Sequence, residues 1–160
     1  MNRNVFAIVF MFAAAAGTIA RADKPVSKSQ LPQQARTFLA THYSDRPVSC
    51  ATIDSGVFET TYDVALDDGT KLEFARNGEW TEIKSPRGGH IPASAVPSKI
   101  ADYVGRNYPK AKVRQMEMDG RNCEVELTNG VEITFNRQME MIRSTDYNKH
   151  RPDHRFTLRE

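Results

Sequence analysis

The side chains most capable of chemistry in this sequence include three potential metal ligands near the C-terminus. The stretch DYNKHRPDHRFTLRE contains His150, Asp153 and His154, and imidazole and carboxylate groups are common zinc ligands. Two histidines four residues apart share one face of a helix, but Pro152 lies between them and disfavours a helix there. We therefore expect these histidines to be solvated, and we predict no metal site.

Glu124 and Glu126 form a second candidate group, because two nearby carboxylates can act as acid and base in hydrolysis. They alternate along a predicted strand and therefore share one face of a sheet. Neighbouring predicted strands add further charges to that face, which is typical of a surface in contact with water. The sequence also has no glycine-rich phosphate loop, nucleophile elbow or zinc signature. We predict no catalytic residues, no cofactor and no enzymatic activity.

Cys50 and Cys123 are the two cysteines of the chain. In an oxidising compartment a disulfide between them is a natural expectation. The alternative is that Cys123, on the apolar side of a predicted strand, serves as a small core residue. A nucleophilic cysteine needs a nearby base, and the four histidines are not placed to supply one.

The first residues indicate where the protein is sent. Arg3 precedes the apolar stretch VFAIVFMFAAAAG, and Ala20, Arg21 and Ala22 follow it, which is the order of parts in a secretory signal peptide. The apolar stretch is shorter than the roughly twenty residues that a membrane-spanning helix needs. We predict that residues 1–22 are a cleaved signal peptide, that the protein resides in the periplasm, and that it is not inserted in a membrane after cleavage.

Cleavage also changes the charge of the chain. Residues 1–22 contain two of the 22 basic residues and none of the 20 acidic ones, so 20 basic residues remain against 20 acidic ones. A formally neutral chain lacks the positive excess typical of nucleic-acid-binding proteins. Nor does it have a basic amphipathic stretch that would hold it on an anionic membrane.

Two segments, residues 31–83 and 96–142, carry the same pattern of residue types. The matching positions are 65 residues apart in the first part of each segment and 61 apart in the second. The matches are Pro32, Phe38, Tyr43 and Val48 with Pro97, Tyr103, Tyr108 and Val113, then Tyr62, Leu66, Gly69, Phe74 and Trp80 with Cys123, Leu127, Gly130, Phe135 and Met141. Such internal similarity indicates two copies of one supersecondary unit.

Each copy begins with a predicted helix and continues with predicted strands. LPQQARTFLATHY and VPSKIADYVGRNY have apolar residues at helical spacing and a proline at the start. Apolar and polar residues then alternate, and the pairs Asp68-Gly69 and Asn129-Gly130 favour tight hairpin turns. One side of each predicted sheet is apolar and suited to a covering helix, and the other is charged.

The sequence therefore predicts an α+β fold of two tandem repeats, each a helix followed by an antiparallel meander, with the helices on one face of the sheet. We place the first repeat at residues 23–84, a linker at 85–95, the second repeat at 96–145 and a C-terminal tail at 146–160. A unit of about fifty residues buries little surface alone, so two copies that share a sheet are more stable than either.

The pattern of LP, a helix that ends in Tyr43, and then YDVALDDGTKLEFARNGEW resembles the PepSY-like group of exported bacterial proteins. The resemblance covers roughly residues 29–143. The second copy departs from it, because Asn136-Arg137-Gln138 replaces an Asn-Gly turn and Met141 replaces the tryptophan. The resemblance implies a fold similar to that of the beta-lactamase inhibitor protein, a place in the Gram-negative envelope, and the binding or inhibition of another protein.

In that inhibitor the open sheet surface makes the contact, so the resemblance points to the charged sheet face as the binding surface. The candidate residues are Asp63, Lys71, Glu73, Glu124, Glu126 and Glu132. Trp80 is either a surface anchor beside them or a core residue packed against the first helix. The partner we predict is an unidentified envelope protein or peptide. The alternative is a small-ligand or metal sensor or carrier of the envelope.

Overall fold

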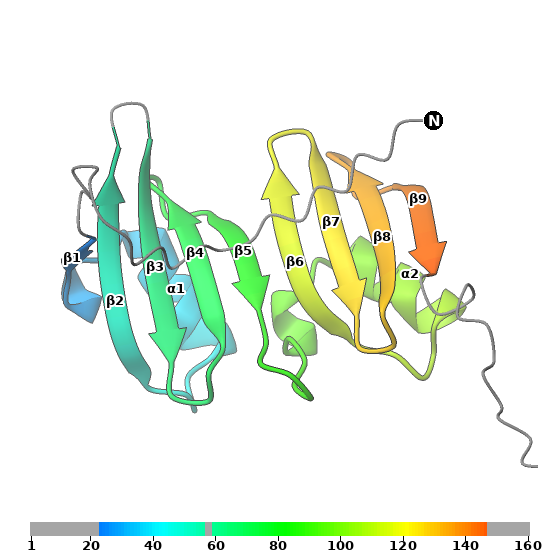
Figure 1. Cartoon of the computed structure of the whole chain (residues 1–160), viewed down its shortest axis with the longest axis horizontal. Coiled ribbons are helices and arrows are strands. Elements are labelled where there is room, and N and C mark those ends of the chain that lie inside the picture. The colour runs from blue at the N-terminus through cyan, green and yellow to red at the C-terminus, as the bar shows by residue number, and fades with distance from the viewer. Residues whose placement is uncertain (1–22, 57–58, 147–160) are drawn as a thin grey trace, which may run out of the picture.

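The computed structural model describes residues 23–56 and 59–146, which form an antiparallel sheet of nine strands with two α-helices on one face (Figure 1). The α+β class predicted from the sequence is confirmed. The predicted signal peptide, and the tail with His150, Asp153 and His154, lie outside the described residues. The strands are β1 (Lys24–Pro25), β2 (Val48–Ser55), β3 (Thr60–Leu66), β4 (Lys71–Ala75), β5 (Trp80–Lys84), β6 (Val113–Asp119), β7 (Asn122–Leu127), β8 (Val131–Asn136) and β9 (Met141–Asp146).

The strands lie in the sheet in the same order as in the chain, so each pairs with the next one. Helix α1 (Gln33–His42) comes before β2, and helix α2 (Ser98–Asn107) comes between β5 and β6. Two short 3-10 helices, Lys28–Gln30 and Ala93–Ala95, precede them. The two α-helices lie on the same side of the sheet, α1 behind the first strands and α2 behind the last (Figure 1).

Both helices begin after a proline, whose φ is already close to the helical value and whose missing N–H costs a helix start nothing. Ala35 and Leu39 of α1 are buried, as are Ile100 and Val104 of α2. This spacing places one apolar stripe of each helix against the sheet. The helices thus form because their apolar stripes have a sheet to cover.

An aromatic pair joins each helix to the sheet. The rings of Phe38 on α1 and Phe74 on β4 meet edge to face with centroids 6.0 Å apart. Tyr103 on α2 and Phe135 on β8 meet in the same way at 5.5 Å. Such contacts are worth about 0.5–1.5 kcal/mol each beyond the area they bury.

The sheet has two halves, β1 to β5 and β6 to β9. Bulges interrupt four of the strand pairs, and the positions of these bulges correspond in the two halves. One lies at the start of the first hairpin in each half, between Val48 and Cys50 and between Val113 and Gln115. The other lies where the last strand of each half begins, opposite Phe74 and opposite Phe135. A bulge adds a residue to one strand and turns two successive side chains toward one face.

The predicted disulfide between Cys50 and Cys123 is wrong. Cys50 is exposed on β2 and Cys123 is buried on β7, and both thiols are free. Four strands lie between β2 and β7, so five steps of about 4.8 Å each place the two backbones about 24 Å apart. A disulfide requires Cα atoms closer than about 7 Å. The alternative for Cys123 is confirmed, because this thiol is fully buried in the core between sheet and helices.

Trp80 packs on the helix side of the sheet rather than on the charged side. It opposes the buried Phe74 and is itself partly buried against the core. The interpretation of Trp80 as a surface anchor among the charged residues is therefore wrong, and the core alternative is confirmed.

Candidate functional site

The charged side chains of the sheet gather on the face opposite α1 and α2, which we call the polar face. Strand alternation puts them there, since the alternate residues of β3, β4, β7 and β8 are buried or partly buried under the helices. The structure brings six of the residues chosen from the sequence onto this face. They are Asp63, Lys71, Glu73, Glu124, Glu126 and Glu132. Their role in binding stays a prediction.

Five carboxylates cross the polar face in one line, which we call the acidic row. Each one is the direct cross-strand partner of the next, on five consecutive strands from β3 to β7. Its members are Asp63, Glu73, Glu82, Glu117 and Glu124. At about 4.8 Å per strand the row spans about 19 Å, and it runs across the junction between the two halves of the sheet.

Glu82 and Glu117 were missed by the reasoning from the sequence. Alternation from Trp80 would place Glu82 on the helix side, but the bulge opposite Phe74 turns both Thr81 and Glu82 toward the polar face. Glu117 lies between two apolar residues, Met116 and Met118, and this alternation in the sequence could have placed it on the polar face. The contact between β5 and β6 could not be found in this way, because a loop and α2 separate the two strands in the chain.

The environment of the acidic row favours the protonated form of several members. Burial, followed by the charge of Glu73, raises the pKa of Asp63 to about 6. Burial raises the pKa of Glu82, and the charge of Glu117 adds to the shift. Burial and then the charge of Glu124 raise the pKa of Glu117. Both causes disfavour ionised carboxylates, so the row holds negative charge at an energetic cost.

Neutral side chains donate hydrogen bonds to two members of the row. The Thr81 hydroxyl donates to Oε1 of Glu73 at 2.5 Å, and Nε2 of Gln115 donates to Oε1 of Glu82 at 2.9 Å. These contacts fix the positions of the two carboxylates without cancelling their charge. The row is thus ordered and negatively charged.

A second row of paired residues runs beside the acidic row. Lys71 opposes Lys84, Lys84 opposes Gln115, and Gln115 opposes Glu126. Glu126 in turn opposes Glu132 on β8 and forms an ion pair with Arg114. The positive side chains of this row therefore lie in the first half of the sheet, and its carboxylates lie in the second.

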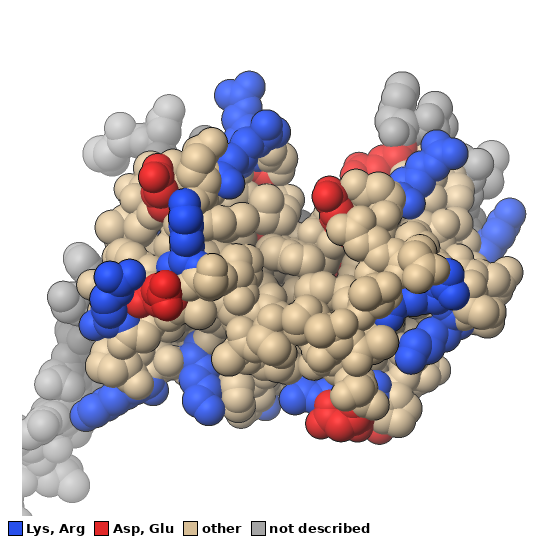
Figure 2. Space-filling view, turned by 180° about the vertical axis from the view of Figure 1, so that it is seen from behind, with Lys and Arg blue, Asp and Glu red and all other residues tan. Residues whose placement is uncertain are grey.

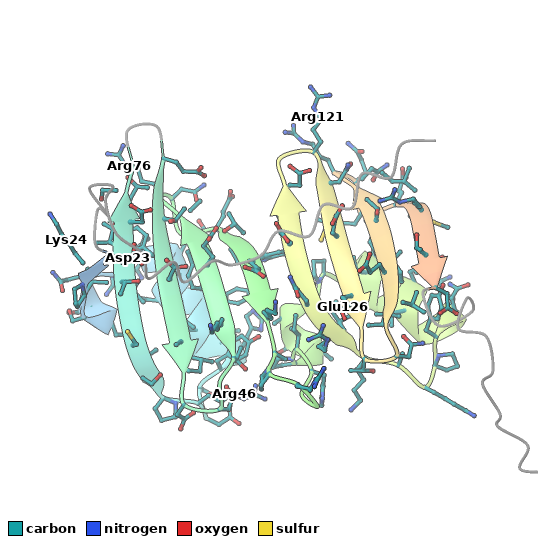
Figure 3. All side chains as sticks on the ribbon, viewed as in Figure 1. Asp23, Lys24, Arg46, Arg76, Arg121 and Glu126 are labelled. Atoms are coloured by element: carbon teal, nitrogen blue, oxygen red, sulfur yellow. The ribbon has the colours of Figure 1, made fainter. Side chains whose placement is uncertain are left out.

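A shallow hollow of about 640 Å³ lies on the polar face over β5 to β9. Its charged lining residues are Glu117, Asp119, Glu124, Glu126, Glu132, Lys84 and Arg143. Glu126 lies near the end of β7, and Arg121 extends from the β6–β7 turn at the opposite end of the sheet (Figure 3). The hollow is large enough for side chains of a partner and is more negative than positive.

The helix side of the molecule has a different surface. Uncharged side chains cover its middle, and charged ones lie mostly toward its rim (Figure 2). Among the residues that the structure describes, no three histidine, cysteine or acidic side chains are arranged to hold a metal ion. Within the same residues, no helix is long and apolar enough to cross a membrane.

Comparison with known proteins identifies the family. Residues 60–143 match the family described as "Putative beta-lactamase-inhibitor-like, PepSY-like". This chain belongs to the PepSY-like family. The resemblance predicted from the sequence is therefore confirmed. No curated protein matches the chain.

Crystal structures of three proteins from Bacteroides are similar to this one. A "putative periplasmic protein" of the DUF2874 family from Bacteroides vulgatus ATCC 8482 is 41% identical, with a TM-score of 0.73 over 79% of this chain and 99% of its own. A "putative calcium-regulated periplasmic protein" from Bacteroides thetaiotaomicron is 35% identical, with a TM-score of 0.72 over 78% and 97%. A third, of unknown function and also from Bacteroides vulgatus ATCC 8482, is 31% identical, with a TM-score of 0.70 over 78% and 100%.

These proteins are described as periplasmic, and this chain is a periplasmic protein as predicted. Their descriptions name no reaction and no binding partner. The word "calcium-regulated" applies to the Bacteroides thetaiotaomicron protein.

Proposed function

We propose that this PepSY-like protein is a non-enzymatic binding module of the periplasm, which holds a positively charged segment of a protein or peptide partner on its polar face. The acidic row is the observation that carries the proposal. Five carboxylates on consecutive strands present a line of negative charge about 19 Å long, which matches an extended or helical segment rich in lysine and arginine.

The cost of the row is a physical reason to assign it a binding role. Like charges at directly opposed positions of a sheet destabilise it by up to about 1 kcal/mol for each pair. A cationic partner would remove this repulsion, and charge complementarity would speed its association and select it over neutral partners.

The proposal includes the two-repeat organisation predicted from the sequence. Each half consists of a proline-initiated helix of 10 residues followed by antiparallel strands. The corresponding bulges and the two edge-to-face aromatic pairs support an origin from one unit. We place the repeats at residues 23–84 and 96–145, joined by 85–95 and flanked by a signal peptide at 1–22 and a tail at 146–160.

A binding assay with a short oligolysine peptide tests the charge of the face. We would compare the wild type with Glu73→Lys and Glu124→Lys, which reverse one charge in each half of the row. Asp102→Lys is the matched control, because Asp102 is exposed on α2, on the opposite side of the sheet. We expect each reversal in the row to weaken binding about tenfold or more, since a close like charge opposes the ligand. The control should bind like the wild type.

Capture from a periplasmic extract with the same four proteins then identifies the natural partner. A partner of the proposed kind carries a basic segment, is enriched by the wild type and the Asp102→Lys control, and is lost with either reversal in the row. Equal recovery by all four proteins would disprove the role of the polar face. Recovery of acidic proteins alone would also contradict the proposal.

Calcium binding is a second candidate function, favoured by the description of the Bacteroides thetaiotaomicron relative. Carboxylate oxygens are the ligands that Ca²⁺ prefers. The acidic row holds five carboxylates side by side, although no three acidic side chains of the described residues are already arranged around one cation position. If Ca²⁺ binds the folded protein selectively, it raises the melting temperature with increasing concentration. The test is a thermal unfolding series in Ca²⁺ against Mg²⁺, repeated with Glu82→Gln. An unchanged melting temperature in millimolar Ca²⁺ would exclude this candidate.

A further inference from the structure

The two halves of the sheet meet through a short contact between β5 and β6, which we call the joint. It comprises three residue pairs, Glu82 with Glu117, Ile83 with Met116, and Lys84 with Gln115. The neighbouring contacts, β4 with β5 and β6 with β7, comprise four and six pairs. The joint is therefore the shortest contact between the long strands, and one of its three pairs opposes two carboxylates.

The two sides of the joint differ in character. Ile83 and Met116 are both fully buried under the helices, so their pair stabilises the joint through packing. Glu82 and Glu117 oppose each other on the polar face, where direct cross-strand carboxylates repel. The apolar pair thus stabilises the joint, and the pair of acids destabilises it.

Every strand beside the joint adds negative charge to it. Glu73 on β4 faces Glu82, and Glu124 on β7 faces Glu117. Asp63 on β3 and Asp119 on β6 act on them from farther away. Lys84 is the cation that lowers the pKa of both glutamates, and the Gln115 side chain donates a neutral hydrogen bond to Glu82. Four acids against one lysine leave a net repulsion around the pair.

We propose that the joint is a proton-sensitive contact between the two halves, loosened when Glu82 and Glu117 are both ionised and tightened when either carboxyl group holds a proton. A protonated carboxyl can donate a hydrogen bond to its ionised neighbour, which turns a repulsive pair into an attractive one. This device goes beyond the proposed function, because it concerns the protein alone and needs no partner.

The direction of the pH dependence follows from the folded state. Burial and neighbouring acids raise the pKa of both glutamates above the ordinary value of 4.5, so the folded protein binds these protons more tightly than the unfolded chain does. The contribution of these two groups to stability therefore rises as the pH falls from neutral toward 4.5. Conversely, this contribution is lost as the pH rises through the raised pKa values.

The test measures melting temperatures of the wild type, Glu82→Gln, Glu117→Gln and the double variant at pH 7.5 and pH 4.5. At pH 7.5 each single variant should melt about 3 °C above the wild type, because one neutral side chain removes the repulsion. The double variant should gain less than the sum of the two single gains, since the repulsion between Glu82 and Glu117 is lost only once. At pH 4.5 the differences should shrink. Asp102→Asn is the control, because Asp102 is exposed on α2 and outside the sheet, and it should leave the melting temperature unchanged.

Hydrogen exchange locates the effect in the joint. At one pH, where intrinsic rates are equal, amides of β5 and β6 should exchange more slowly in the Glu82→Gln variant than in the wild type, while those of β2 and β3 stay unchanged. Protection confined to β5 and β6 supports the joint. Additive gains in the double variant, an equal gain in Asp102→Asn, or lower stability of the single variants at pH 7.5 would overturn it.

Discussion

Two tyrosines in corresponding places, Tyr43 and Tyr108, show how single residues distinguish the halves. Each follows the end of a helix. The Tyr108 hydroxyl and the Ser144 hydroxyl share a hydrogen bond of 2.8 Å. The Tyr43 hydroxyl is buried and has no hydrogen-bond partner among the residues that the structure describes, and burial raises the pKa of Tyr43. The same side chain is thus satisfied in one half and not in the other.

We expect Tyr108→Phe to lower the stability of the protein and Tyr43→Phe not to lower it. A buried polar group without a partner costs about 1–3 kcal/mol, so Tyr43→Phe should raise the free energy of unfolding or leave it unchanged. The Arg46 guanidinium lies 5.4 Å from the Tyr43 ring centroid, and a phenylalanine ring keeps that contact. Tyr108→Phe loses a hydrogen bond and should lower the free energy of unfolding by about 1 kcal/mol.

Urea unfolding of both variants and the wild type measures the two changes in the free energy of unfolding. The comparison requires that the free energy falls with urea concentration at the same slope in all three proteins. A destabilised Tyr43→Phe variant would show that the buried hydroxyl makes a favourable interaction in solution. Since these two tyrosines recur at a constant spacing, the sequence predicted their common place but not their different surroundings. Ser144 lies on β9, 61 residues after its apolar counterpart Ile83, but only the fold reveals its contact with Tyr108.

At the scale of elements, the turn between β4 and β5 ties the sheet to α1. Gly78 has φ +87°, a conformation that side chains with a Cβ rarely adopt. A Cβ at this position would lie 2.9 Å from the backbone nitrogen of Ala35 and from Cβ of Pro32, at the start of α1. In the second half Met139 adopts φ 57° at the corresponding place. Glycine therefore matters at position 78 for space as well as for conformation.

We expect Gly78→Ala to destabilise the protein more than Gly88→Ala does. Gly88 has nearly the same φ, +84°, but nothing lies within 4 Å of its would-be Cβ, so it isolates the cost of conformation, about 1–2 kcal/mol. Gly78→Ala adds a clash with the backbone of α1 and should cost about 1–2 kcal/mol more. The free energies of unfolding of the two variants give the comparison. Equal losses would mean that the turn moves away from α1 without cost.

The elements also show what a sequence can and cannot predict here. Helices, hairpins and the buried side of most strands follow from local periodicity, since α1, α2 and the turns at Gly69 and Gly130 lie where the pattern placed them. The acidic row was predicted only in part, because a bulge reversed the alternation before Glu82. The joint depends on a pairing between distant segments, which periodicity does not encode. The disulfide failed for the same reason, because cysteine counting ignores strand order.

At the scale of the whole molecule, one set of carboxylates affects both stability and binding, and protons change the two in opposite directions. A proton on Glu82 or Glu117 removes repulsion and tightens the joint. The same proton removes a negative charge that would attract a cationic partner. Binding and stability therefore have opposite pH dependences if the joint and the binding face share the acidic row.

We expect binding of the oligolysine peptide to weaken about fivefold between pH 7.5 and pH 5, at constant ionic strength, while the melting temperature of the protein rises. The pKa of Asp63 is raised to about 6, so this carboxyl group changes from mostly charged to mostly neutral in that interval. Lysine side chains stay charged throughout, and loss of one close charge contact of about 1 kcal/mol corresponds to roughly a fivefold change in Kd. Titration calorimetry and thermal unfolding measure the two quantities in the same buffers.

Asp63→Asn is the informative variant. It should bind the peptide more weakly than the wild type at pH 7.5, and its binding should depend less on pH. The pH response of the joint should be preserved. Peptide binding that strengthens at pH 5, or that Asp63→Asn does not change, would show that the peptide does not bind at the acidic row.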